Sequence, residues 1–235
     1  MKPSLWTPTA PEVKELQALL RRLESVTEMM TSEQNRWETA TPTVAVLTQE
    51  HLDYLKQQQQ LIKKLIGDHF DQHPHLKQQR ELLTSIPGIG DVTASVLLAE
   101  IRDVSDYNNA RQLAAYAGLT PCERSSGTSV KGKTRLSCTG NVRLRKALYL
   151  PAVVAMRHNP LLKAMSDRLL GRGKVKMQVI GALMRKLVHL AFGILKSQKP
   201  FDPNYLTATP WQIKTVSTKS LLQNSQRASN TIDSF

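Results

Sequence analysis

The stretch Leu82-Leu83-Thr84-Ser85-Ile86-Pro87-Gly88-Ile89-Gly90 decides how this chain of 235 residues folds. Its leucines belong to one helical stretch, and a second stretch, rich in alanine and leucine, follows at 91–101. Proline fixes its own φ, and glycine adopts backbone conformations closed to other residues, so the chain can reverse direction here. The sequence therefore predicts two short helices joined by a tight turn near residues 82–101.

The residues before this turn are predicted to form a helical arm. Apolar side chains recur at three- and four-residue steps in two long stretches that are separated by a break at Pro42. We expect residues 1–9 to be a tail and residues 10–72 to be the arm. The arm is either an antiparallel helical hairpin or an intermolecular coiled coil, because neither helix buries its apolar stripe alone.

The residues after the turn complete a compact helical domain, which we place at 73–200. Further helices are predicted at 141–157, 160–170 and 174–197. No stretch shows sustained strand alternation, so the predicted class is all-α. From residue 201 the chain becomes rich in Ser, Thr, Asn and Gln, and 201–235 is expected to be a disordered polar tail.

Positive charge is concentrated in one part of the chain. The formal net charge is +13, but residues 111–200 hold eighteen Lys or Arg and only two acids, Glu123 and Asp167, giving +16 there and −3 elsewhere. Such a segment repels itself unless a polyanion neutralises it, and phosphate contacts release condensed counterions. Apolar stretches and glycine loops interrupt these cations, which favours nucleic acid over an anionic membrane surface. DNA is therefore the expected partner.

Composition also limits the location of the chain. No run of about 18 uncharged apolar residues is present, so no membrane span is expected. The first residues lack the apolar stretch of a signal peptide, and the two cysteines, Cys122 and Cys138, lack the spacing of a zinc site. The expected location is the cytoplasm.

The turn at 85–90 is one candidate for contact with DNA. It resembles the helix-hairpin-helix element, in which Pro87, Gly88 and Gly90 would bring backbone N–H groups of the next helix to a phosphate. The alternative is a plain corner between two helices that packs its apolar residues.

A second candidate is the glycine-, serine- and threonine-rich loop at 118–140. Small hydroxylated residues lie among cations there, which suits an oxygen nucleophile that attacks a phosphodiester. Composition alone fits a plain connection equally well. This loop and the helix after it contain the predicted DNA-binding residues, which are Arg124, Lys131, Lys133, Arg135, Asn141, Arg143, Arg145 and Lys146. For the cations of the helix, the alternative is a solvated face that binds nothing.

Several stretches in the same order resemble the carboxyl-terminal part of a bacterial transposase family. They are 85–90, 111–121, 126–129, 140–152 and 199–202, and the likeness extends over roughly residues 10–205. The family is the insertion sequence one-hundred-and-ten group, the DEDD-type transposases, whose members are RNA-guided recombinases. The resemblance implies DNA transposition by a serine that becomes covalently linked to a DNA phosphate. The matching residue is Ser126, and Ser125 and Ser129 are the less favoured candidates.

The resemblance also implies a nuclease-like domain ahead of this region, whose four acidic residues hold Mg²⁺. We expect this chain to begin after that domain, to hold no metal or cofactor itself and to be inactive alone. Two alternatives stay open, a non-catalytic DNA- or RNA-binding relic and an oligomerising inhibitor of an intact transposase. The resemblance implies DNA and a guide RNA as partners. The narrow apolar stripes of the arm predict a second copy of the chain as a further partner, joined through Leu16, Leu23, Leu55 and Ile62.

Overall fold

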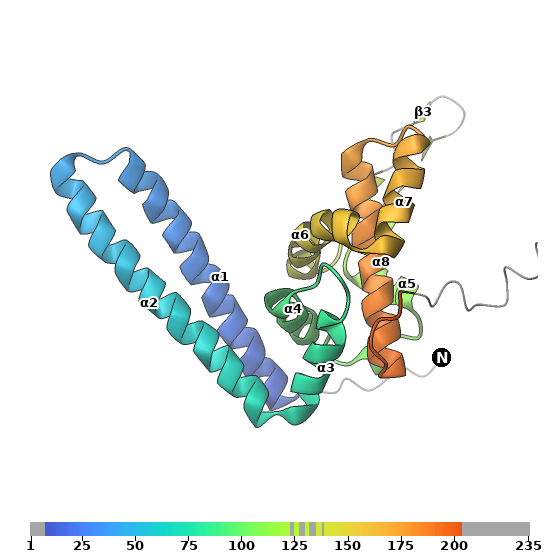
Figure 1. Ribbon diagram of the computed structural model, residues 1–235, viewed down its shortest axis with the longest axis horizontal. Helices are drawn as coiled ribbons and strands as arrows, with labels where there is room; N and C mark the ends of the chain where they lie inside the picture. Colours follow the sequence, from blue (N-terminus) through green and yellow to red (C-terminus); the bar gives the residue numbers. More distant parts are fainter. Residues whose placement is uncertain (1–7, 123–124, 127–129, 132–134, 138, 204–235) are drawn as a thin grey trace, which may run out of the picture. The chain divides into compact units, whose positions relative to one another are not determined.

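A computed structural model describes residues 8–122, 125–126, 130–131, 135–137 and 139–203 (Figure 1). The chain divides into two compact units, Met1–Phe201 and Asp202–Phe235, and every element below belongs to the first. Residues 1–7 of the predicted amino-terminal tail, and 204–235 of the predicted carboxyl-terminal tail, lie outside the described residues.

The arm is a helical hairpin made of α1 (Pro11–Glu38) and α2 (Pro42–Gln72), which lie side by side in blue and cyan in Figure 1. Both helices begin with proline, whose missing N–H costs nothing in a first turn. Within one chain, α1 and α2 thus form the hairpin, one of the two arrangements left open above. The four residues expected to meet a second copy, Leu16, Leu23, Leu55 and Ile62, are all buried in the chain's own core and are not available to a partner.

The compact domain is all-α, as predicted, and is built around one apolar helix. Its helices are α3 (Pro74–Thr84), α4 (Asp91–Ile101), the 3-10 turn η1 (Val104–Asp106), α5 (Ala110–Tyr116), α6 (Val142–His158), α7 (Pro160–Gly171) and α8 (Lys176–Ser197). Helix α8 packs against α5, α6, α7 and α3. The arm joins this domain through α1, which packs on α4, and Gln17 Nε2 donates a hydrogen bond to the Ala99 carbonyl oxygen at 2.7 Å.

One helix of the described residues, α8, is long and apolar enough to cross a membrane by length and composition alone. Its mean hydropathy reaches 1.4, and 61% of the window concerned is buried inside the fold. The sequence prediction counted only uncharged runs, and Arg185 and Lys186 interrupt this one. The burial of α8 among its neighbours is typical of a core helix.

The described residues between α5 and α6 include four short strands, which we call the ribbon, where the sequence predicted only a loop. Strand β1 (Pro121–Cys122) pairs antiparallel with β4 (Arg135–Leu136), and β2 (Ser125–Ser126) pairs antiparallel with β3 (Val130–Lys131). Strands of two residues are too short to show alternation, so the pattern gave no sign of them.

Two glycines close the foot of the ribbon. Gly118 has φ +68° and Gly140 has φ +135°, and a Cβ on Gly140 would lie 2.5 Å from the Tyr116 carbonyl oxygen and 2.6 Å from Gly118 N. The Asn141 N–H donates to that same Tyr116 carbonyl at 2.7 Å. Backbone meets backbone here, so the two ends of the ribbon are held together where α5 ends and α6 begins.

The 85–90 turn packs against α6 through Gly88. Gly88 has φ +105°, and a Cβ there would lie 2.9 Å from Ala155 Cβ and 3.0 Å from the Pro151 carbonyl oxygen. Asn159, which is completely buried, donates from Nδ2 to the Pro87 carbonyl at 3.3 Å. Ile86 and Ile89 are buried as well. At Gly88 the geometry is that of a packed corner.

We expect Gly88→Ala to lower the free energy of unfolding by about 1–3 kcal/mol, because the new methyl group meets α6 and the positive φ disfavours alanine. Gly90→Ala is the matched control, since Gly90 has φ −95° and nothing lies within 4 Å of the position of its Cβ. Its effect should stay within about 0.5 kcal/mol. Urea unfolding of both variants measures the difference, and equal losses would contradict this role of Gly88.

Candidate nucleic-acid interface

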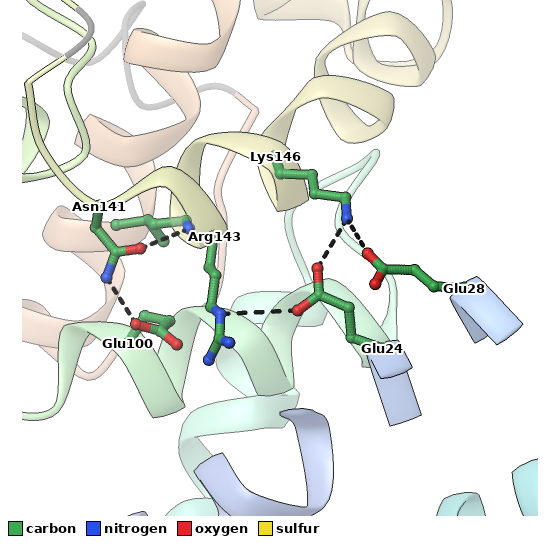
Figure 2. Close-up of polar contacts among 7 residues, drawn as sticks. Glu24, Glu28, Glu100, Asn141, Arg143 and Lys146 are labelled. Carbon is green, nitrogen blue, oxygen red and sulfur yellow. Dashed lines mark hydrogen bonds and ion pairs between the residues drawn. The ribbon is translucent and has the colours of Figure 1, made fainter. Parts of the chain in front are cut away.

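The first turns of α6 carry cations that the arm already neutralises. Lys146 Nζ lies 2.8 Å from Glu24 Oε1 and 3.2 Å from Glu28 Oε1, and Arg143 Nε lies 3.7 Å from Glu24 Oε2 (Figure 2). The hydrogen bond to Glu24, followed by that to Glu28, raises the pKa of the Lys146 amine. The side chains are exposed, so each pair is weak and open to competition by other anions. Arg143 and Lys146, both predicted to bind DNA, thus face carboxylates of α1.

Two further residues that were predicted to bind DNA hold the helices together. Asn141 caps α6, because its Oδ1 accepts from Leu144 N at 3.0 Å while its Nδ2 donates to Glu100 Oε2 at 2.6 Å (Figure 2). Arg145 Nη1 donates to the Ala117 carbonyl oxygen at 3.4 Å, beside the foot of the ribbon. These contacts join α4, α5 and α6.

The turn leaves one of its three predicted residues accessible. Pro87 and Gly88 are half-buried, whereas Gly90 is exposed and is the N-cap residue of α4 without a side-chain cap. The Asp91 carboxylate follows in the first turn of α4, and Arg80 Nε lies 3.9 Å from Asp91 Oδ1. Only Gly90 therefore retains the open surroundings that a phosphate would need.

The ribbon brings the candidate serines opposite basic and apolar residues of its second half. In the backbone register Ser125 pairs with Lys131, and Ser126 pairs with Val130. Ser129, Arg124 and Lys133, which were also singled out in the sequence, lie outside the described residues.

Three cations that have no carboxylate partner among the described residues lie beside the foot of the ribbon. Arg135, Lys174 and Arg185 lie around a hollow of about 610 Å³ that we call the ribbon-foot pocket. No ion pair joins any of the three to an acid of the described residues. Of these, only Arg135 was among the predicted DNA-binding residues.

Sequence reasoning missed Arg185 because it interrupts an apolar core helix. The spacing of polar residues in this helix could have indicated it, because Gln178 and Arg185 are one heptad apart and therefore share a face of α8. His189 lies one turn further along the same helix. Burial lowers the pKa of His189, and the charges of Arg185, Lys186 and Arg111 lower it further. Burial and the neighbouring cations therefore both favour the neutral form of this histidine.

The described residues do not fit a metal site. No group of three or more His, Cys, Asp or Glu side chains in that part of the chain lies close enough to hold an ion.

Comparison with known proteins finds one family model and several relatives that this chain resembles. Residues 80–167 match the model described as "Transposase IS116/IS110/IS902 family". The "Pilin gene-inverting protein" of Moraxella bovis is 32% identical over 201 residues, which cover 85% of this chain and 62% of that protein. The "Insertion element IS110 uncharacterized 43.6 kDa protein" of Streptomyces coelicolor is 38% identical over 115 residues, or 49% of this chain and 28% of the relative.

A third relative is the "Transposase for insertion sequence element IS1111A" of Coxiella burnetii, 34% identical over 96 residues, 40% of this chain and 26% of that protein. The chain thus spans 62% or less of the length of these relatives. The matched region runs from α3 through the turn, the ribbon and α6 into α7. The likeness inferred from the sequence is confirmed at this level: residues 80–167 match the family model, and the relatives are insertion-element proteins and a gene-inverting protein.

Proposed function

We propose that this chain acts in DNA recombination, in which strands are cut and rejoined, with Ser126 as the nucleophile. The observation that carries the proposal is the family match, which contains the ribbon. Relatives are named for inverting a gene and for an insertion-sequence transposase. Both processes require phosphodiester bonds to be broken and remade.

The chemistry assigned to Ser126 is a transfer of the phosphoryl group. Its Oγ loses a proton and forms a bond to phosphorus, while the bond from phosphorus to one DNA oxygen breaks and that oxygen leaves as a hydroxyl. The resulting ester keeps the phosphate activated until a second DNA hydroxyl attacks and releases the serine. A serine hydroxyl is a poor nucleophile near neutral pH, so cations must stabilise the charge that develops on phosphorus. Arg135 and the ribbon's Lys131 support this assignment by their places in the chain.

Two partners of the reaction are proposed from the resemblance alone. A nuclease-like domain would supply the acidic ligands for Mg²⁺, and a guide RNA would choose the DNA target. Neither is required for the backbone contacts that the cationic segment makes with DNA.

The role of Ser126 is tested by trapping a covalent protein–DNA adduct on a nicked substrate, with the nuclease-like domain of a relative added to the chain. We expect an adduct from the wild-type chain and none from Ser126→Ala. Ser125→Ala and Ser129→Ala should retain at least part of the yield, and the chain without the added domain should form little. An unchanged yield from Ser126→Ala would assign the nucleophile to another residue.

We further expect DNA binding that depends steeply on salt, because residues 111–200 carry a net charge of +16. With roughly five or six phosphates neutralised, the slope of log K against log salt should be about −5. A titration with nearly salt-independent affinity would contradict backbone binding.

The carboxylates of α1 should weaken this binding, because they occupy Arg143 and Lys146. In the same titration, Glu24→Gln/Glu28→Gln should bind about three- to tenfold tighter and steepen the slope by about 1 to 2. The control Glu33→Gln/Glu38→Gln removes the same charge from the arm, away from α6, and should behave nearly as wild type. Equal effects of the two double variants would mean that net charge alone is responsible.

We also propose that the arm joins two copies of the chain, through a face of α2 other than the one first predicted. Val44, Leu47, Tyr54, Leu61 and Leu65 are 43–63% exposed, and with His51 and Gln58 they repeat at alternating steps of three and four. This is the spacing of a coiled-coil seam. Glu50 flanks one half of the seam and Lys64 the other, so antiparallel copies bring opposite charges together.

Sedimentation of the purified chain tests this seam at tens of micromolar, well above the dissociation constant of a stable dimer. We expect the wild-type chain to be a dimer and Leu47→Lys/Leu61→Lys to be a monomer. Val46→Lys/Gln60→Lys adds the same charge outside the seam and should remain dimeric. A monomeric wild-type chain would overturn the proposal.

A further inference from the structure

The ribbon-foot pocket lies between the ribbon and the carboxyl-terminal helices. Pro121 and Leu136 line it from the ribbon, Leu169 from α7, and Met177 and Ala182 from α8. Leu136 reaches α8 because Gly181 has no side chain: a Cβ there would lie 3.0 Å from Leu136 Cδ1. The ribbon is thus anchored on α8 beside the pocket.

The surface of the pocket combines an apolar floor with a cationic rim. Its described lining contains the three cations Arg135, Lys174 and Arg185, but neither a carboxylate nor an aromatic ring. Met177, 64% exposed, is an apolar side chain with no cover. A volume of about 610 Å³ falls in the range of pockets that take small ligands. The ligand that complements this surface has an apolar body of modest size and carries negative charge on either side.

A nucleotide that has left its base stack has this chemistry. Its base buries two flat faces against aliphatic side chains, and the flanking phosphates meet the cations of the rim. Arginine guanidinium groups also stack on bases. A paired duplex offers only phosphates and groove edges, which a hollow cannot enclose.

The pocket is also close to the candidate nucleophile along the chain. Ser126 lies four positions after Cys122, which adjoins the pocket residue Pro121, so covalent geometry limits the distance between the Cα atoms of Cys122 and Ser126 to about 14 Å. Successive phosphates of a DNA strand advance about 3.4 Å along the helix axis, so this reach is about four nucleotides or fewer.

We infer that the ribbon-foot pocket binds one unstacked nucleotide of the DNA strand, within a few nucleotides of the phosphate that Ser126 attacks. The inference rests on the proposed function for its choice of DNA as ligand. Lys174 and Arg185 lie beyond residue 167, where the family match ends, so the match does not assign them a role. Such a site would hold the strand in position while its two ends are exchanged.

The experiment compares two short DNA duplexes that bind to the full chain. One contains a single unpaired 2-aminopurine, a base that fluoresces when it is unstacked, and the other has the same sequence fully paired. We expect the bulged duplex to bind roughly tenfold tighter, with a gain in fluorescence because the described pocket lining contains no aromatic ring to quench it.

Three variants assign this preference to the pocket. Ala182→Leu fills the floor, and Met177→Asp places a carboxylate at the mouth on a side chain that is already exposed, so folding is unaffected. Both variants should lose the preference for the bulged duplex and the gain in fluorescence. For Ala182→Leu, the affinity for the paired duplex should fall less than threefold. Arg185→Gln should reduce the preference, whereas Lys163→Gln removes the same charge from α7 outside the pocket and should keep it.

Binding here does not depend on strand cleavage, so the test separates this inference from the proposed function. Ser126→Ala should keep the full preference for the bulged duplex, whatever the outcome of the adduct assay. A wild-type chain without the preference, or Ala182→Leu and Met177→Asp variants that both retain it, would overturn the inference. Binding to phosphatidylserine vesicles that Ala182→Leu abolishes, without any preference for the bulged duplex, would assign the pocket to an acyl chain instead and would also overturn it.

Discussion

The close approach of the 85–90 turn to α6 is the constraint on which the rest of the domain depends. Gly88 lies against Ala155 and the Pro151 carbonyl, where no Cβ fits. Asn159, at the junction of α6 and α7, donates a hydrogen bond to the Pro87 carbonyl. This contact fixes α6 relative to α3 and α4. The direction of α6 then determines where its first turn meets the arm and where the foot of the ribbon begins.

The electrostatics of the interface follow from that placement. Because α6 passes the arm, Glu24 and Glu28 neutralise Arg143 and Lys146, so a row of cations in the sequence is largely compensated in space. At the foot of the ribbon, Arg135 meets Lys174 and Arg185 instead, and no acid of the described residues pairs with them. Among the described residues, some cations of the domain are therefore paired with carboxylates, whereas others remain free to bind an anion. Three of the described cations without an acidic partner lie beside the ribbon that carries Ser126.

Helix α2 of the arm carries two apolar stripes, only one of which is buried. Leu52, Leu55, Ile62 and Ile66 of α2 are buried on the chain's own core, while Val44, Leu47, Tyr54, Leu61 and Leu65 form a second stripe on another face. Both stripes repeat at steps of three and four, so periodicity alone cannot say which of them closes the hairpin. Burial in the folded chain assigns the first stripe to α1 and leaves the second exposed.

Much of this protein was determined by local sequence. The all-α class, the two arm helices, the turn at Pro87–Gly90 and the last three helices follow from apolar periodicity and from proline and glycine, because these act within a few residues. The family likeness over residues 80–167 could be read from short motifs for the same reason. Tertiary structure alone decided which groups meet. Asn141 caps α6, and Arg145 donates a hydrogen bond to the Ala117 carbonyl at the end of α5. Gly88 contacts α6, and Arg185 lies at the rim of the ribbon-foot pocket. The physical reason is that each of these roles is set by a partner from another element, and a helical or ribbon sequence does not encode the distance to that partner.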